Sequence, residues 1–363
     1  MSAKLNVHLQ EVPRTFPTFQ RPEVLGYYSL NTERQFCDDL SELKYLVPHH
    51  RRKRKHNLNY NIEDIVKKDE DVNERLDTIL QWILRNAHNL KDDSGTRLRT
   101  DFVCFRGLLT MLICTPYETR DDWIICATKW KGTIYLCAFE TEDAKRQRLQ
   151  ASEHQKKCMA WGRKFEQHMA TARPGGCPDI EQPINEKAEF CVAFQSKLKN
   201  HRLLYCAEMD CVKTDTEIKD LKELQKTEFV EIKTSRIITH PGQYRSLKRF
   251  KFMKWWAQSF LVNINCIICG FRNDEGVVEE VREYMVPELA KTSKDTWNAA
   301  AGLNFCETFL DFVKNTVKEE SLEVVWKFDW GPNRDVCGVK LTGITDFSIL
   351  PLWYTDNLIL SAS

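Results

Sequence analysis

The chain has 363 residues, of which 42% are hydrophobic and 29% charged, values that are ordinary for a globular protein with a large core. Its 53 basic and 52 acidic residues leave a formal net charge of +1, so any contact with RNA or DNA must come from local patches rather than from a global basic field. The most apolar stretch, 260–271, is too short to cross a membrane, and residues 1–16 lack the apolar segment of a signal peptide.

The cysteines indicate a reducing compartment. Fourteen are present, and many lie within apolar runs, as Cys104, Cys126 and Cys206 do. In a chain of this length they are predicted to be buried thiols rather than a disulfide framework. Cys266 and Cys269 have the spacing of a zinc knuckle, but no second pair lies at a suitable distance, so we expect no zinc site there.

The first part of the chain is expected to contain few regular elements. Residues 1–20 are predicted to be irregular, and a strand at 24–30 and a short helix at 33–46 follow. Residues 48–73 are predicted to form a long surface loop that includes the basic run HHRRKRK at 49–55. That run is typical of a solvated loop, and equally of a nuclear localisation signal or a non-specific phosphate contact.

Helical and strand-like periodicities alternate along the rest of the sequence. Helices are predicted at 74–90, 141–172, 244–260 and 300–317. Strands are predicted at 101–116, at 123–140 with a hairpin turn at Lys131 and Gly132, and at 189–197, 202–212, 228–234, 261–271, 322–330 and 336–353. In the helix at 244–260, Trp255 and Trp256 are expected to pack in the core, while its basic residues could follow a phosphate backbone.

Two charged pairs lie within otherwise apolar stretches. Glu208 and Asp210 form the first pair, and Glu231 and Lys233 form the second. Residues two apart on a β-strand share one face, so two adjacent strands of this kind would bring three carboxylates and one lysine together. Such carboxylates repel one another unless a cation lies between them, and Mg²⁺ or Mn²⁺ is the natural cation for oxygen ligands.

A lysine beside such a metal suits a phosphate, so the arrangement predicts hydrolysis of a phosphodiester or pyrophosphate. The order acid-x-acid, then acid-x-lysine, is also that of the PD-(D/E)xK nuclease core. For either pair alone, a solvated strand face is the simpler interpretation. Glu166 is a candidate fourth acid, because Gly162 lies four residues before it on the same helical face and opens space there.

Six motifs, taken in order, resemble those of the DXO family of RNA 5′-end decapping exoribonucleases. They are FVCFRG at 102–107, GRKFE at 162–166, EMD at 208–210, EIKTS at 231–235, KWWAQSF at 254–260 and CGFRN at 269–273. The resemblance extends from about Arg21 to the end of the chain. It implies one α+β domain over residues 1–363, with a mixed central β-sheet and a second sheet surrounded by helices and a PD-(D/E)xK-like catalytic core.

The resemblance also implies an Mg- or Mn-dependent hydrolase acting in mRNA 5′-end quality control. Such enzymes remove triphosphates, unmethylated caps or NAD caps from RNA, and many have 5′-to-3′ exoribonuclease activity. The implied ligands of two divalent metal ions are Glu166, Glu208, Asp210, Glu231 and the backbone carbonyl of Ile232. Lys233 and Gln258 would contact the scissile phosphate, and Arg106 would bind the RNA 5′ end.

Two alternatives stay open. One is a non-catalytic scaffold that binds RNA 5′ ends or supports a nuclear exoribonuclease, and the other is a DNA endonuclease with the same core. Since no acid, lysine or glutamine of the family pattern is missing, the hydrolase is preferred. We expect a nuclear monomer, with additional cytoplasmic residence open, and an association with a nuclear 5′-to-3′ exoribonuclease is also open because some fungal relatives form one.

Overall fold

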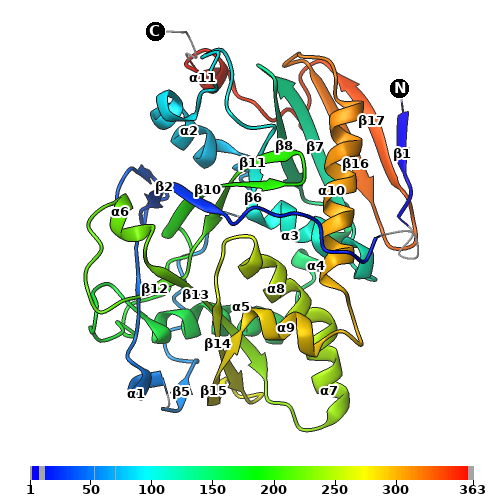
Figure 1. The fold of residues 1–363 in the computed structure, drawn as a ribbon. Coiled ribbons are helices and arrows are strands. Elements are labelled where there is room, and N and C mark those ends of the chain that lie inside the picture. Colours follow the sequence, from blue (N-terminus) through cyan, green and yellow to red (C-terminus); the bar gives the residue numbers. More distant parts are fainter. Residues whose placement is uncertain (1, 8–12, 53, 70, 359–363) are drawn as a thin grey trace.

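The computed structural model describes residues 2–7, 13–52, 54–69 and 71–358 (Figure 1). The strands of these residues form two mixed β-sheets, and helices cover both of them. In the view of Figure 1 the larger sheet occupies the upper half of the molecule and the smaller sheet the lower half. The predicted α+β class with two sheets is therefore confirmed.

The larger sheet has parallel pairs at its centre, where β6 lies between β8 and β11, while its other neighbouring strands are antiparallel. In the described part of the chain its order is β1 (Ser2–Leu5), β17 (Val336–Thr342), β16 (Val324–Trp330), β7 (Trp123–Trp130), β8 (Thr133–Phe139), β6 (Phe102–Phe105), β11 (His201–Glu208), β10 (Glu189–Leu198), β2 (Glu23–Leu30) and β3 (Phe36–Cys37).

The smaller sheet is also mixed, because β13 pairs in parallel with β14 and β12 pairs in parallel with β4. Over the described residues its order is β5 (His56–Asn57), β15 (Val277–Met285), β14 (Cys266–Arg272), β13 (Glu228–Arg236), β12 (Cys211–Lys213), β4 (Tyr45–Leu46) and β9 (Ala170–Thr171). The strands β11 and β12 follow each other in the chain but belong to different sheets, so the chain crosses between the sheets after Glu208.

Helices fill the space between the sheets and cover their outer faces. They are α1 (His49–Arg52), α2 (Asp77–Leu90), α3 (Arg106–Cys114), the 3₁₀ turn η1 (Thr115–Tyr117), α4 (Glu142–Leu149), α5 (Glu153–Met169), α6 (Leu221–Leu224), α7 (Pro241–Ser246), the π-helical η2 (Leu247–Phe252), α8 (Met253–Phe260), α9 (Val286–Thr292), α10 (Ala299–Thr316) and α11 (Leu352–Thr355).

Three hydrophobic clusters show which helices pack on each face of the two sheets. The largest joins residues of both sheets to α3, α8 and α10, and it contains Trp255 and Trp256, which are buried as predicted. A second cluster packs α2, through Trp82, on the other face of the larger sheet. A third packs α5, through Trp161 and Phe165, on the outer face of the smaller sheet.

The alternation of side chains along β13 places the second charged pair. Val230 and Ile232 belong to the cluster under α5, whereas Phe229 belongs to the cluster between the sheets. Because neighbouring residues of a strand point to opposite faces, Glu231 and Lys233 face the space between the sheets, where α3 and α8 lie. The spacing of this pair predicted a shared face, and the structure identifies that face.

The predicted helix at 33–46 is wrong. This segment instead contains β3 and β4, which are joined by turns. Arg34 has a φ of 68°, in the left-handed region that a right-handed helix cannot continue through. Its guanidinium bonds to Glu74 and forms an ion pair with Glu189, so tertiary contacts determine this conformation.

The predicted strand at 101–116 is wrong after its first residues. Only β6 is extended, and α3 begins at Arg106. The apolar residues Leu108, Leu109 and Leu112 recur at helical spacing and are buried, but a short apolar run does not separate a buried strand from a buried helix. This correction moves Arg106 from a strand to the first position of a helix.

The predicted helix at 141–172 is two helices, α4 and α5. The break lies at Ser152, whose hydroxyl accepts from the Gln155 backbone while the Gln155 side chain accepts from the Ser152 backbone, a capping box that starts a new helix. Smaller corrections concern segment ends. Residues 1–20 include β1, residues 48–73 include α1 and β5, β14 begins only at Cys266, and β17 ends at Thr342.

The predicted hairpin turn at Lys131 and Gly132 is confirmed. Lys131 and Gly132 have φ values of 46° and 76°, as a tight hairpin turn requires. All fourteen cysteines are free, and Cys266 and Cys269 are buried in β14. Among the described residues these two belong to no group of metal-ligating side chains. No helix in the described part of the chain is long and apolar enough to span a bilayer.

Candidate active site

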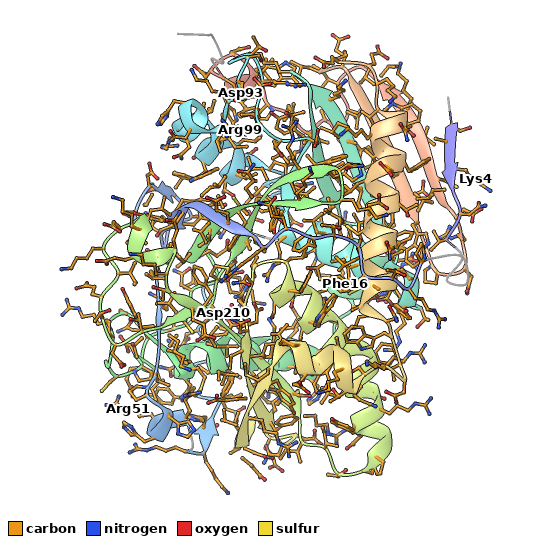
Figure 2. The ribbon with its side chains drawn as sticks, in the orientation of Figure 1. Lys4, Phe16, Arg51, Asp93, Arg99 and Asp210 are labelled. Carbon is orange, nitrogen blue, oxygen red and sulfur yellow. The ribbon has the colours of Figure 1, made fainter. Side chains whose placement is uncertain are left out.

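The first acidic pair lies at the crossing between the two sheets. Glu208 is the last residue of β11, and Asp210 lies in the short link to β12. The two residues therefore do not lie on one strand, and the prediction that they share one strand face is wrong. Met209 between them is 3% exposed and packs in the core between the sheets, which anchors the link. Figure 2 shows Asp210 near the middle of the molecule.

Asp210 connects the link to β13. Its Oδ2 accepts a hydrogen bond of 2.6 Å from the backbone N–H of Ile232. Ile232 lies between Glu231 and Lys233, so this bond sets the first acidic pair beside the second. Glu208 comes from the larger sheet and Glu231 from the smaller, and the link between the sheets brings them to one place.

Glu231 is held between two cations. Its side chain is 2% exposed, and the Lys233 Nζ lies 2.5 Å from Oε1 and the Arg106 Nη1 3.4 Å from Oε2. Burial alone would raise the Glu231 pKa, but Lys233 and Arg106 outweigh burial and lower it. Burial likewise opposes the charge of Lys233, yet Glu231 and Asp210 raise the Lys233 pKa. Both groups are charged at neutral pH.

Arg106 and Gln258 meet at this place as well. The Arg106 Nη1 donates to the backbone carbonyl of Gln258 at 3.3 Å as well as contacting Glu231. Arg106 starts α3 and Gln258 lies in α8, so two helices between the sheets bring these residues to β13. The six residues proposed from separate motifs, together with Arg106, thus come from α3, α5, α8, β13, the end of β11 and the β11–β12 link.

Glu166 enters the site from α5 through a residue that the sequence reasoning missed. Arg163, one turn earlier on the helix, contacts Glu166 Oε2 at 3.2 Å and Glu208 Oε1 at 3.0 Å with the same Nη1. Burial raises the Glu166 pKa, and Arg163 offsets part of that increase. The i, i+3 spacing of Arg163 and Glu166 could have identified this arginine.

The carboxylates fit divalent cations. Burial, and then the charges of Glu231 and Glu166, hold the pKa of Asp210 well above its usual range. The pKa of Glu166 is also raised, and burial is again the largest cause. A hard cation such as Mg²⁺ or Mn²⁺ would offset this repulsion and stabilise the ionised form of the carboxylates.

A cavity of about 420 Å³ opens onto these acids, and Arg163, Glu166, Glu208 and Asp210 lie in its wall. Glu231, Lys233, Arg106 and Gln258 do not contribute to that wall. A further carboxylate, Glu189 at the start of β10, does contribute to it. Burial and the charge of Glu208 raise the Glu189 pKa, although Arg34 lies 2.8 Å away. No motif spacing pointed to Glu189, because only the fold brings it to the cavity.

Several of the basic residues that could contact phosphates are paired within the fold. Lys248 of the π-helical η2 pairs with Asp295, and Lys251 donates to the Ser235 hydroxyl. In the basic run at 49–55, Arg52 is buried against Glu283, while Arg54 and Lys55 are exposed and Lys53 lies outside the described residues. Part of the positive charge in these two segments thus pairs with neighbouring groups of the fold.

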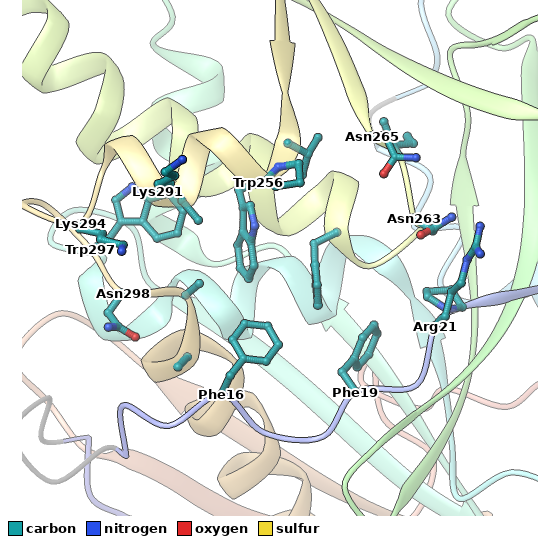
Figure 3. Close-up of a pocket in the computed structure, with 18 of the residues that line it drawn as sticks. Phe16, Phe19, Arg21, Trp256, Asn263, Asn265, Lys291, Lys294, Trp297 and Asn298 are labelled. Atoms are coloured by element: carbon teal, nitrogen blue, oxygen red, sulfur yellow. The ribbon is translucent and has the colours of Figure 1, made fainter.

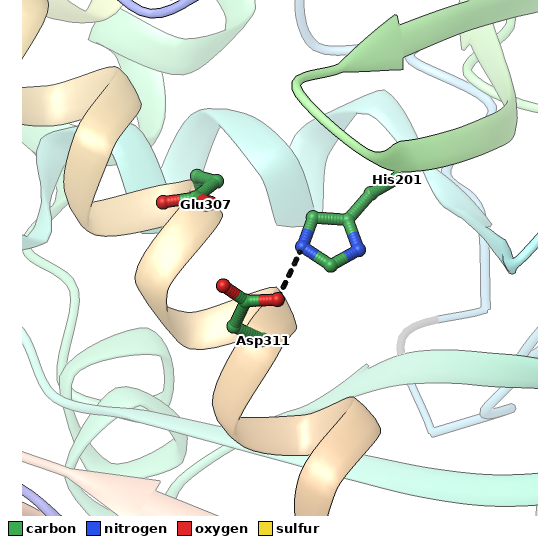
Figure 4. A group of neighbouring side chains, drawn as sticks. All are labelled: His201, Glu307 and Asp311. Atoms are coloured by element: carbon green, nitrogen blue, oxygen red, sulfur yellow. Dashed lines mark ion pairs between the residues drawn. The ribbon is translucent and has the colours of Figure 1, made fainter.

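The described residues contain one group of three potential metal-ligating atoms within 4.8 Å of one another, formed by His201, Glu307 and Asp311 (Figure 4). His201 Nε2 lies 3.0 Å from Asp311 Oδ1, and Lys199 Nζ lies 3.0 Å from Glu307. This group links α10 to the start of β11, at the end of that strand remote from Glu208. The predicted acids are spaced more widely than this group.

Comparisons with known proteins agree with the geometry. The model of a family described as "RAI1 like PD-(D/E)XK nuclease" matches residues 20–355. The human "Decapping and exoribonuclease protein" is 36% identical over 351 residues, which cover 94% of this chain and 87% of that protein. The Drosophila melanogaster "Decapping and exoribonuclease protein Rai1" is 33% identical over 94% of this chain and 92% of its own length.

Solved structures share the fold. Scheffersomyces stipitis Rai1 in complex with (3′-NADP)⁺ and calcium superimposes with a TM-score of 0.85 at 19% identity, covering 98% of this chain and 99% of that one. Candida albicans Rai1 in complex with pU5 and Mn²⁺ superimposes with a TM-score of 0.84 at 18% identity, covering 99% of each chain. At these identities the similarity concerns the architecture.

Proposed function

The chain belongs to the RAI1-like PD-(D/E)XK nuclease family and is a metal-dependent decapping nuclease, and we propose that it hydrolyses the 5′ ends of RNA that carry a triphosphate, an unmethylated cap or an NAD cap. The observation that carries the proposal is the meeting of Glu166, Glu208, Asp210 and Glu231 with Lys233 at the crossing between the sheets. We also propose 5′-to-3′ exoribonuclease activity, which the name of the human relative supports.

Divalent metal ions are part of the proposal. Glu166, Glu208, Asp210 and Glu231 would hold two of them, together with the backbone carbonyl of Ile232. When bound, such ions activate a water for attack on phosphorus and neutralise charge on the leaving oxygen. Mn²⁺ and calcium accompany two relatives of the same fold, and we propose Mg²⁺ or Mn²⁺ for this chain because all the donors are oxygens.

Lys233 and Arg106 are suited to bind the phosphates. Lys233 is 23% exposed and contacts Glu231 through one of three N–H donors, so its ammonium can also donate to a phosphate oxygen. Arg106 uses Nη1 for Glu231 and Gln258, which leaves the N–H groups of Nε and Nη2 for a 5′ phosphate. The Gln258 side chain would contact the scissile phosphate from α8.

The shape of the site favours the end of a single strand. The cavity of about 420 Å³ has the size of a pocket that encloses a small ligand. A cavity of this size beside the acids suits a terminal nucleotide or cap better than an internal position of duplex DNA. The size of the cavity therefore favours the RNA 5′-end hydrolase over the DNA endonuclease with the same core.

Nuclear residence stays part of the proposal, with Arg54 and Lys55 as the exposed residues that would support it. Fluorescent fusions of the wild type and of a variant with both residues changed to glutamate test this point. We expect the wild type in the nucleus and the variant spread through the cell. Equal distributions would contradict the signal.

The decisive experiment compares three RNAs of one sequence, bearing a 5′ triphosphate, an unmethylated cap or an NAD cap, in Mg²⁺ and in EDTA. We expect metal-dependent release of the 5′ group, and the fastest substrate identifies the preferred end. Glu231→Gln should lower the rate by more than about a hundredfold, whereas Glu228→Gln on the same strand serves as the matched control. Binding of all three RNAs without hydrolysis would contradict the proposed hydrolase and favour the non-catalytic scaffold.

A further inference from the structure

A second cavity lies apart from the acids. It has a volume of about 690 Å³ and is formed by the N-terminal segment at 14–22, α8, α9 and the start of α10 (Figure 3). In the sequence, Phe16 and Phe19 belong to a stretch that was predicted to be irregular, and no motif included them. The cavity is within the size range of sites that bind small ligands or single nucleotides.

The charges around this cavity have one sign. Arg14, Arg21, Lys291 and Lys294 line it, and the lining residues include no aspartate or glutamate. All four side chains belong to exposed residues. Lys291 lies 3.5 Å from Glu288 on its own helix, an exposed pair that contributes little to holding the lysine in place. The rim therefore presents a local positive field in a chain whose formal net charge is only +1.

The wall of the cavity is aromatic. Trp256 stacks on Phe260 with ring centroids 4.9 Å apart. The ring of Phe19 also lies against the ring of Phe260, with centroids 5.0 Å apart. Phe16 contacts Phe260 edge-on at 5.7 Å yet is 49% exposed. Figure 3 shows Phe16 and Phe19 along the N-terminal segment, facing the helix that carries Trp256. Phe16 therefore presents part of its ring to solvent while its edge contacts the packed rings.

We propose that this cavity binds a nucleotide unit of single-stranded RNA, with a base stacked on Phe16 and phosphates among Arg14, Arg21, Lys291 and Lys294. The inference rests on the proposed function, because it extends the path of the same RNA strand. Aromatic platforms beside cationic rims are the general means of binding single strands without reading sequence. Neutral apolar ligands would not use the four cations, and acidic peptides would not use the exposed ring as a stacking surface.

The position of the cavity makes it distinct from the active site. Trp256 and Phe260 each lie two residues from Gln258 on α8, so they project from nearly the opposite side of the helix. One helix, about 10 Å thick, therefore separates the cavity from the side on which Gln258 lies. An RNA whose 5′ end is at the acids would therefore have to pass around α8 before a downstream nucleotide could enter the cavity.

The test measures binding in EDTA, so that hydrolysis does not contribute. The probes are a 16-nucleotide and a 4-nucleotide RNA, both with a 5′ hydroxyl and a 3′ fluorophore, and unlabelled GMP as competitor. Phe16→Ala should weaken binding of the 16-mer by at least about fivefold. Lys294→Glu should weaken it and lower the slope of log affinity against log salt by about 0.7. Neither change should alter binding of the 4-mer.

Lys222→Glu on α6 is the matched control, since Lys222 is an exposed lysine outside the cavity. If both cavity variants bind the 16-mer as tightly as the control does, the proposal is overturned. If GMP binds as tightly as the 16-mer and both variants lose it, the cavity takes free nucleotides and the RNA assignment fails. Length-dependent binding by a protein that hydrolyses no RNA would support the cavity and reject the proposed function.

Discussion

The Arg163 guanidinium lies 3.0 Å from the carboxylate of Glu208, and the nitrogen that makes this contact also lies 3.2 Å from Glu166. One side chain of α5 thus joins a carboxylate of its own helix to a carboxylate at the end of β11. The charges of Glu208 and Glu166 in turn raise the pKa of Arg163. Arg163 supplies positive charge between two predicted metal ligands.

We expect Arg163→Met to increase metal affinity. The variant leaves Glu166 and Glu208 without their shared cation, so the two carboxylates attract a divalent ion more strongly. We expect the Kd for the metal to decrease by about threefold to tenfold. The same loss should lower the melting temperature of the metal-free protein. Titration calorimetry with Mn²⁺ measures the first effect, and Lys156→Met, which removes an exposed pair on the same helix, is the control. Weaker metal binding by Arg163→Met would show that the arginine instead orients the ligands.

Asp210→Asn should stabilise the metal-free protein while abolishing its response to metal. Burial and the nearby acids disfavour the Asp210 charge, and asparagine keeps an oxygen that can accept from the Ile232 N–H. A gain of about 1 kcal/mol corresponds to a melting temperature about 2 °C higher in EDTA. Mn²⁺ should raise the melting temperature of the wild type only. A variant that melts below the wild type in EDTA would contradict the repulsion inferred here.

Metal binding should weaken as the pH falls into the acidic range, already above the usual pKa of a carboxylic acid. The pKa values of Glu166 and Asp210 are raised, so these acids take up protons at a higher pH than free carboxylates, and protons then compete with the metal. The folded metal-free protein also binds these protons more tightly than the unfolded chain. The contribution of these two acids to the free energy of unfolding is therefore largest at low pH. It decreases as the pH rises through their raised pKa values. Calorimetric Mn²⁺ titrations at several pH values check the first point, and a pH-independent Kd would refute it.

Two glycines near Glu166 should respond oppositely to alanine. A Cβ on Gly270 of β14 would lie 2.7 Å from the Phe165 ring, next to Glu166 on α5. Gly270→Ala should therefore destabilise the protein by about 1–3 kcal/mol and reduce kcat by displacing Glu166. A Cβ on Gly162 would meet only Thr234, at 3.9 Å. Gly162→Ala should be tolerated or even stabilising by about 0.5 kcal/mol. Denaturant unfolding and RNA hydrolysis rates measure both variants, and equal effects would contradict this difference.

The sequence determined which residues are the candidates for the chemistry, because carboxylates, lysine and glutamine at motif spacing are chemical features that need no coordinates to recognise. It also determined most helices and strands, since hydrophobic periodicity reflects which face is buried. Its local errors, at 33–46 and 106–114, occurred where tertiary contacts of Arg34 or burial of α3 overrode a pattern that was ambiguous over a short length.

Only the tertiary structure decided how the site is assembled. Glu208 and Asp210 look like one strand face in the sequence, but the chain changes sheets between them, and the Ile232 N–H bond fixes the result. Arg163, Glu189 and the aromatic cavity at Phe16 follow from packing between segments far apart in the chain. Spacing along a chain specifies which side chains share a local face, whereas contacts between sheets and helices depend on the burial of whole elements.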